Sequence, residues 1–157
     1  MRRSVLVLAA VLVLTTGFAG SGSSQSTPAT PSADRAAIAR VAERQNRAWA
    51  ARDVDGILSV YSTDIVMMPP EEKAIHGKDA LRRWFADVFG NAAFQPASGV
   101  SEELLLAGDL AVGRMTLRSG AGLAIGKVIH VYRRQADGAW KITRDIWNAD
   151  APTPGSR

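Results

Sequence analysis

The chain has 157 residues, about the size of one domain. Hydrophobic residues make up 46% and charged residues 22%, which excludes a wholly disordered chain, a collagen-like repeat and a polytopic membrane protein. There is no cysteine, so disulfides, thiolate metal sites and cysteine nucleophiles are excluded. Lys and Arg number 19 against 15 Asp and Glu, a formal net charge of +4. Two of these cations, Arg2 and Arg3, belong to a segment that we expect to be removed, so no nucleic-acid partner is predicted.

The first residues have the pattern of an export signal. A short basic start precedes an uninterrupted apolar run from Val5 to Leu14, which is shorter than the roughly 20 residues of a spanning helix. Small residues at Gly17 and Ala19 predict cleavage after Ala19. We therefore expect a signal peptide at 1–19, a secreted or periplasmic product, and no stable membrane span after processing. A twin-arginine route and a retained anchor are the alternatives.

The segment 20–33 consists of small and polar residues with prolines, and it contains no large apolar side chain. Such a segment buries too little surface to offset the entropy of ordering, so it is predicted to be a flexible linker. The tail at 151–157 has the same character and is predicted to be disordered. The folded domain is accordingly expected at 34–150.

Three helices are predicted in the first half of the domain. Apolar residues recur with a period of 3.6 over 34–51, with Gln45 as the exception on that face. Asp53 is placed to cap a short second helix, and Gly77 to Gly90 bound a third. Between the second and third helices, 64–69 reads as a strand that ends at two prolines.

The second half changes to a period of two, which is typical of strands. The expected strands are 100–107, 110–118, 123–134 and 139–149, with turns at Gly108-Asp109 and Asp137-Gly138. Helices followed by a meander of long strands indicate an α+β fold. A strongly curved antiparallel sheet wrapped around the helices would bury one of its faces.

The last hairpin predicts which side chains face each other. If its loop has an even number of residues, His130 lies opposite Asp145 and Tyr132 opposite Thr143, with Trp147 on the same face. An odd loop would shift the register and separate His130 from Asp145. Ile129 and Ile146 occupy the other face, where apolar residues indicate a covered surface.

Three stretches together resemble the nuclear transport factor 2-like superfamily, and more narrowly its SnoaL-like and ketosteroid-isomerase-like members. They are RDVDGILSVY at 52–61, IHGKDAL at 75–81 and GKVIHVYRRQADGAWKITRDIWN at 126–148. The resemblance implies a cystatin-like cone, in which helices close a pocket on a curved sheet, and a homodimer packed through the outer sheet face. It covers isomerases, polyketide cyclases, dehydratases and non-catalytic assembly domains, so the fold alone does not give the function.

The residues argue against ketosteroid isomerase itself. Those enzymes carry an aspartate base before a proline at the end of the first strand, where this chain has Met67-Met68-Pro69-Pro70. Their oxyanion tyrosine on the first helix corresponds here to Gln45. Since a thioether cannot abstract a proton, that activity is not expected.

His130 and Asp145 are the candidate catalytic residues. The resemblance implies that their sheet face lines the pocket, and an oriented His–Asp pair can act as a general base on a C–H bond or a water. The alternative is a satisfied polar pair with a structural or ligand-binding role. No metal or organic cofactor is expected, and the residues do not decide whether the domain is an enzyme.

The expected ligand is a small apolar or carbonyl-bearing molecule, and the chemistry expected of an enzyme is isomerisation, dehydration or cyclisation. The candidate ligand-binding residues combine apolar side chains with polar groups, and they are Tyr132, Trp147, Met68, Trp84, Tyr61 and Arg114. Arg114 could instead face solvent or a partner subunit. The alternative function is a non-catalytic assembly module whose pocket is packed shut by Met67, Met68, Trp84 and Trp147.

Overall fold

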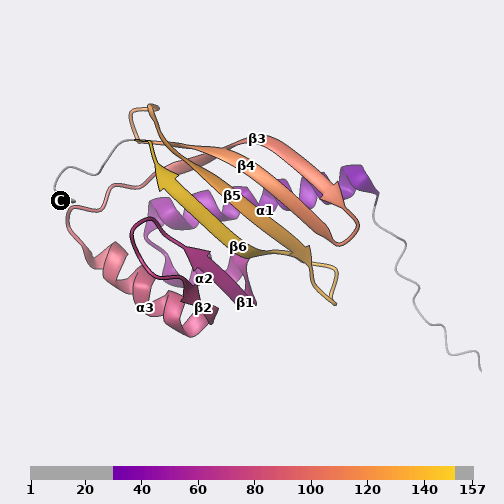
Figure 1. The fold of residues 1–157 in the computed structure, drawn as a ribbon, viewed down its shortest axis with the longest axis horizontal. Helices are drawn as coiled ribbons and strands as arrows, with labels where there is room; N and C mark the ends of the chain where they lie inside the picture. Colours follow the sequence, from indigo (N-terminus) through magenta and orange to yellow (C-terminus); the bar gives the residue numbers. More distant parts are fainter. Residues whose placement is uncertain (1–29, 151–157) are drawn as a thin grey trace, which may run out of the picture.

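Three helices pack on a six-stranded sheet in the computed structural model, which describes residues 30–150 (Figure 1). The helices are α1 (Pro31–Ala51), α2 (Val54–Val60) and α3 (Gly77–Gly90). The strands are β1 (Tyr61–Met68), β2 (Ile75–His76), β3 (Ser98–Ala107), β4 (Leu110–Arg118), β5 (Ala124–Arg134) and β6 (Trp140–Ala149). The α+β class and the helices and long strands predicted from periodicity are therefore confirmed, while β2 was not predicted.

The strand order is β2-β1-β6-β5-β4-β3, and the sheet is mixed. β3 to β6 form an antiparallel meander, but β1 runs parallel to β6. The expectation of an antiparallel sheet is wrong at this one pair. The chain leaves β1 through β2 and α3 before the meander begins, and such a crossover allows two neighbouring strands to run in the same direction.

The first helix begins earlier than predicted. α1 begins at Pro31, and the Thr30 side chain accepts a hydrogen bond from the Ala33 backbone N–H as its N-cap. Residues 31–33 are thus helical, which corrects the predicted boundary between linker and domain at Asp34. The predicted signal peptide, the rest of the linker and the tail lie outside the described residues. The predicted cap of α2 is present, since Asp53 Oδ1 accepts from the Gly56 N–H at 2.9 Å.

The hairpin between β5 and β6 differs from the predicted one. Hydrogen bonds from Gln135 N to Ala139 O and from Gly138 N to Gln135 O close a three-residue loop, with Gly138 at φ 81°. Next to this odd loop Tyr132 pairs with Ile142, so the expected Tyr132–Thr143 pair is wrong. The register shifts between Tyr132 and Val131, because Val131 pairs with Arg144. Thr143 is therefore the extra residue of a bulge in β6. Beyond the bulge, His130 pairs with Asp145 as predicted.

The inner sheet face and the helices enclose one apolar core. Its largest fully buried side chains include Tyr61, Tyr132, Phe85, Ile57 and Ile65. The outer face of the sheet instead leaves Ile129 and Ile146 exposed. The helices therefore cover one face of the sheet, and the pocket can form only on that side.

A charged cluster joins the start of α1 to the last hairpin. Asp34 Oδ2 accepts from Arg134 Nη2 at 2.6 Å, and Asp34 Oδ1 accepts from Trp140 Nε1 at 3.1 Å. Arg134 also donates to Asp109 and lies over the Trp140 ring at 4.6 Å. The hydrogen bond from Arg134 holds the pKa of Asp34 below its usual range.

This cluster predicts an acid-sensitive contribution to stability. A lowered pKa in the folded state stabilises the fold above the unfolded-state pKa of about 3.9, and the contribution is lost as the pH falls through the folded value. Asp34→Asn should therefore lower the urea midpoint at pH 7 and flatten its decline between pH 5 and pH 2. Asp87→Asn, at an exposed position of α3, is the control and should leave the decline unchanged. An unchanged pH profile in Asp34→Asn would contradict the assignment.

Candidate functional site

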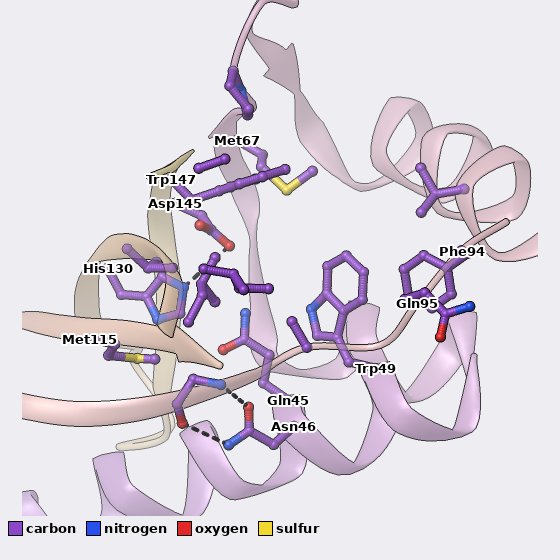
Figure 2. Close-up of a pocket in the computed structure, with 18 of the residues that line it drawn as sticks. Gln45, Asn46, Trp49, Met67, Phe94, Gln95, Met115, His130, Asp145 and Trp147 are labelled. Atoms are coloured by element: carbon purple, nitrogen blue, oxygen red, sulfur yellow. Dashed lines mark hydrogen bonds and ion pairs between the residues drawn. The ribbon is translucent and has the colours of Figure 1, made fainter. Parts of the chain in front are cut away.

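A cavity of about 410 Å³ lies between the inner sheet face and the helices (Figure 2). Its wall is mostly apolar, with a few polar side chains from α1, β5, β6 and the loops that follow β1 and α3. The lining residues are Gln45, Asn46, Trp49, Met67, Pro70, Glu72, Trp84, Val88, Phe94, Gln95, Ala97, Gly99, Met115, Leu117, Ile125, Val128, His130, Asp145, Trp147 and Ala149. An apolar cavity with a few converging polar groups is typical of small-molecule sites.

His130 and Asp145 meet in the wall of this cavity. They stand opposite each other on β5 and β6, and His130 Nε2 lies 3.3 Å from Asp145 Oδ2. The exposed fractions are 2% and 4%, so both groups are removed from bulk water. The predicted pair therefore exists, and both members line the cavity.

Three further buried side chains extend the pair into a chain of hydrogen bonds. The Tyr61 hydroxyl donates to Asp145 Oδ2 at 2.7 Å, and Gln45 Nε2 donates to the Tyr61 hydroxyl at 3.1 Å. At the other end, the Tyr132 hydroxyl lies 3.1 Å from His130 Nδ1. The five residues come from α1, β1, β5 and β6, so this network joins the helical layer to the sheet.

Both tyrosines of this network keep their protons at ordinary pH. Burial raises the pKa of Tyr61 well above its usual value, and the nearby charge of Asp145 raises it further. Burial and the same charge also raise the pKa of Tyr132. Tyr61 is therefore a fixed donor to Asp145. With the proton of neutral His130 on Nε2, Tyr132 donates to Nδ1.

One oxygen of Asp145 is left for the cavity. Oδ2 accepts a hydrogen bond from the Tyr61 hydroxyl and lies 3.3 Å from His130 Nε2, whereas Oδ1 accepts no hydrogen bond within residues 30–150. Oδ1 is also not among the sealed, unpartnered polar atoms of this part of the chain. Both nitrogens of His130 face partners. The atom that can accept a proton or a hydrogen bond from a molecule in the cavity is therefore Asp145 Oδ1.

The predicted ligand-binding residues divide into three groups. Trp84 and Trp147 line the cavity. Tyr61 and Tyr132 do not line it, but they lie directly behind it and bind the two members of the pair.

The structure does not bring Met68 or Arg114 to the cavity, and for Arg114 it agrees with the alternative of a position facing solvent. Side chains alternate along a strand, so β1 turns Met67 into the cavity and pairs Met68 with Ile146 on the outer face. Arg114 also lies on the outer face, where Arg114 Nε is 3.5 Å from Glu103 Oε2.

Several lining residues carried only weak signals in the sequence. Gln45 was visible as the polar exception on an apolar helix face, but its partner Tyr61 could not be inferred. Asn46 exchanges two hydrogen bonds of 2.9 Å with the backbone of Gly99 and so attaches β3 to α1. Trp49 stacks on Phe94 with ring centroids 5.5 Å apart, which places the segment after α3 at the cavity wall. No periodicity signals such contacts between distant segments.

The fold and the cavity define a class of α+β domains that close a pocket between helices and one sheet face. Within this class, residues 42–144 match the family model of the SnoaL-like domain, so the chain belongs to the SnoaL-like family. A search of curated proteins found no match.

Solved structures share the fold. A ketosteroid isomerase-like protein from Erwinia carotovora atroseptica is 25% identical with a TM-score of 0.63, and the match covers 74% of this chain and 96% of that one. A nuclear transport factor 2-like protein of unknown function from Pseudomonas putida is 24% identical with a TM-score of 0.65, covering 82% and 95%. A domain with a cystatin-like fold from Nostoc punctiforme is 16% identical with a TM-score of 0.67, covering 80% and 82%. The cystatin-like architecture is thereby confirmed.

Within residues 30–150, no helix is both long and apolar enough to cross a membrane. The same residues contain no group of three or more His, Asp or Glu side chains arranged to hold a metal ion.

The hydrogen-bond roles predict unequal losses on removing the two hydroxyls. Tyr61→Phe removes a bond to a charged acceptor and should lower the free energy of unfolding by about 1.5–3 kcal/mol. Tyr132→Phe removes a bond to the His130 ring and should cost about 0.5–1.5 kcal/mol. Urea denaturation at pH 8 measures both variants under one condition. A larger loss in Tyr132→Phe than in Tyr61→Phe would contradict the stronger role assigned to the Tyr61 hydroxyl.

Proposed function

We propose that this domain binds a small, largely apolar molecule in its cavity and that the His130–Asp145 pair acts on it as an acid–base group. The observation that carries the proposal is a buried carboxylate that accepts a hydrogen bond from Tyr61, lies 3.3 Å from His130 Nε2 and belongs to the wall of an apolar cavity. A general base must lie within hydrogen-bond reach of the proton that it removes, and Asp145 belongs to the wall of the cavity.

The roles of the two residues differ. Asp145 Oδ1 takes a proton from a C–H bond next to a carbonyl or from a water, while Tyr61 and His130 hold Oδ2 in place. Return of the proton to another atom completes an isomerisation, and loss of a hydroxyl completes a dehydration. His130 is a positioning residue in this scheme, because both of its nitrogens already face partners.

The strand next to β1, β6, carries a carboxylate at the level where β1 has only methionine. Ketosteroid isomerases carry their base near the end of the first strand, where this chain has Met67 and Met68, and Met67 pairs with Asp145 of the adjacent β6. A carboxylate thus stands beside the thioether on the same face, displaced by one strand. This supports acid–base chemistry in a geometry different from that of ketosteroid isomerase.

Proton exchange at carbon tests the catalytic half of the proposal. A panel of small apolar ketones is incubated with the protein in D₂O, and loss of the C–H signals next to the carbonyl is followed by NMR. Asp145→Asn should reduce any exchange about 100- to 10,000-fold, the usual contribution of a general base, and His130→Ala should reduce it less. Asp150→Asn, exposed just beyond β6, is the control and should exchange like the unaltered protein.

Full exchange in Asp145→Asn would contradict the base assignment. No exchange with any ketone, together with no ligand in native mass spectra of the protein from its own host, would favour the alternative of a non-catalytic assembly module. The open cavity favours binding over that alternative, whose pocket would be filled. Export of the chain remains a prediction, because it concerns residues outside 30–150.

We also propose that the outer sheet face binds a second copy of the chain. Two neighbouring rows cross this face: Leu105 pairs with Val112 in one, and Ile129 pairs with Ile146 in the other, and all four side chains are exposed. The Arg114–Glu103 pair lies in the row of Ile129 and offers both signs of charge to an identical face. Two copies related by a two-fold axis would cover each other's apolar rows.

Mass measurement by light scattering checks this interface. The unaltered domain should run as a dimer, and the double variant Ile129→Asp/Ile146→Asp should run as a folded monomer, because two buried charges would face their own copies. Leu123→Asp is the control, since Leu123 is 68% exposed in the turn before β5 and away from both rows. A monomeric unaltered protein at every concentration, or a dimeric double variant, would contradict the proposal.

A further inference from the structure

The charged residues of the cavity wall are of one sign. Asp145 lies deep in the wall and Glu72 lies on an exposed loop at its edge, whereas neither Lys nor Arg lines the cavity. His130 is the one group there that can become positive, and its proton would offset the charge of Asp145 alone. The wall described by residues 30–150 is therefore negative in either protonation state of His130.

Glu72 is held in position rather than free. Its Oε2 accepts a hydrogen bond from Trp84 Nε1 at 2.9 Å, and both residues line the cavity. This bond places a carboxylate beside an aromatic ring. Glu71, the preceding residue, is exposed and does not line the cavity.

Aromatic side chains make up a large part of the remaining wall. Trp49, Trp84, Phe94 and Trp147 all line the cavity, and Figure 2 shows three of them at its wall, Trp49, Phe94 and Trp147. The Phe94 ring already contacts the Arg52 guanidinium at 5.4 Å and stacks on Trp49, so the tryptophans are the rings that can contact a ligand cation. The π-faces of such rings attract cations, tryptophan most strongly. Rings and carboxylates thus favour the same sign of charge in a ligand.

We propose that the molecule bound in this cavity is an apolar organic cation, such as a protonated amine on a hydrophobic body. The inference rests on the proposed function, since it specifies the ligand of the same cavity. Asp145 Oδ1 has room for an N–H donor, and the aromatic rings contact the apolar body. An acid or a phosphate meets no cation in the wall and is rejected, and a neutral molecule gains only from burial.

A matched set of three probes tests the inference. 3-Phenylpropan-1-amine, 3-phenylpropan-1-ol and 3-phenylpropanoate share one aromatic body and differ in head-group charge at pH 7. Affinities are measured by calorimetry, or by the change in tryptophan fluorescence. The amine should bind at least about ten-fold more tightly than the alcohol, and the acid should show no binding.

Two variants locate the source of the preference. Glu72→Gln removes a charge at an exposed position, so the fold is retained, and it should reduce the ratio of amine to alcohol affinity about two- to five-fold. Glu71→Gln removes the neighbouring charge outside the cavity and should leave the ratio unchanged. Asp145→Asn should reduce the ratio of amine to alcohol affinity further. If Asp145→Asn does not fold, the comparison of Glu72→Gln with Glu71→Gln decides the test.

The outcomes separate this inference from the function on which it rests. Equal affinity for amine and alcohol, or tighter binding of the acid, overturns the inference and leaves small-molecule binding intact. No binding of any probe overturns the inference, and it counts against the proposed function when the ketone panel also fails. If Glu72→Gln and Glu71→Gln have the same ratio of amine to alcohol affinity, the proposal that the charge of Glu72 favours a cationic ligand is overturned.

Discussion

The arrangement of this domain depends on the burial of one carboxylate. Removing a carboxylate from water costs several kcal/mol unless donors replace the water, and Asp145 is only 4% exposed. Its polar partners come from two other strands, the donor Tyr61 on β1 and the ion-pair partner His130 on β5, and Gln45 on α1 donates to Tyr61 in turn. The position of α1 over the sheet, the parallel pairing of β1 with β6 and the register of β5 with β6 must all be correct together for this charge to be tolerated.

The register of the last hairpin shows how far sequence reasoning reaches. The pairing of His130 with Asp145 followed from the turn at Asp137-Gly138, and it is correct although the loop is odd. An extra residue in the turn and an extra residue at Thr143 compensate each other, so every pair beyond the bulge has the expected register. Turn residues and period-two patterns are local signals and predict strand positions well. A bulge depends on packing against the rest of the sheet and leaves no clear local signal.

The residues of the cavity wall were harder to predict than the strand positions, because they too depend on contacts between distant segments. Met67 and Met68 are identical in chemistry, and only the pairing of β1 with β6 decides which of them turns inward. Tyr61 was expected to reach the pocket, yet its hydroxyl is consumed by Asp145, and that contact joins residues 84 positions apart. Arg114 has the pattern of a pocket residue in an apolar strand, but alternation places it on the outer face. Long-range register, rather than residue type, decides these positions.

Membership of the SnoaL-like family does not identify the ligand or the reaction. The direction of the hydrogen bonds limits which head groups can bind beside Asp145. Gln45 donates to Tyr61, and Tyr61 and His130 donate toward Asp145, so the donors of the network converge on one carboxylate. Gln45 retains a second amide N–H at the cavity wall, and Asp145 retains an acceptor, Oδ1, that has no hydrogen bond within residues 30–150. A molecule bound against Asp145 brings the donor, the acidic proton or the positive charge itself. The same constraint makes Asp145 a base toward a C–H bond and a counter-ion toward an amine, and the head group of the bound molecule determines which of the two roles it takes.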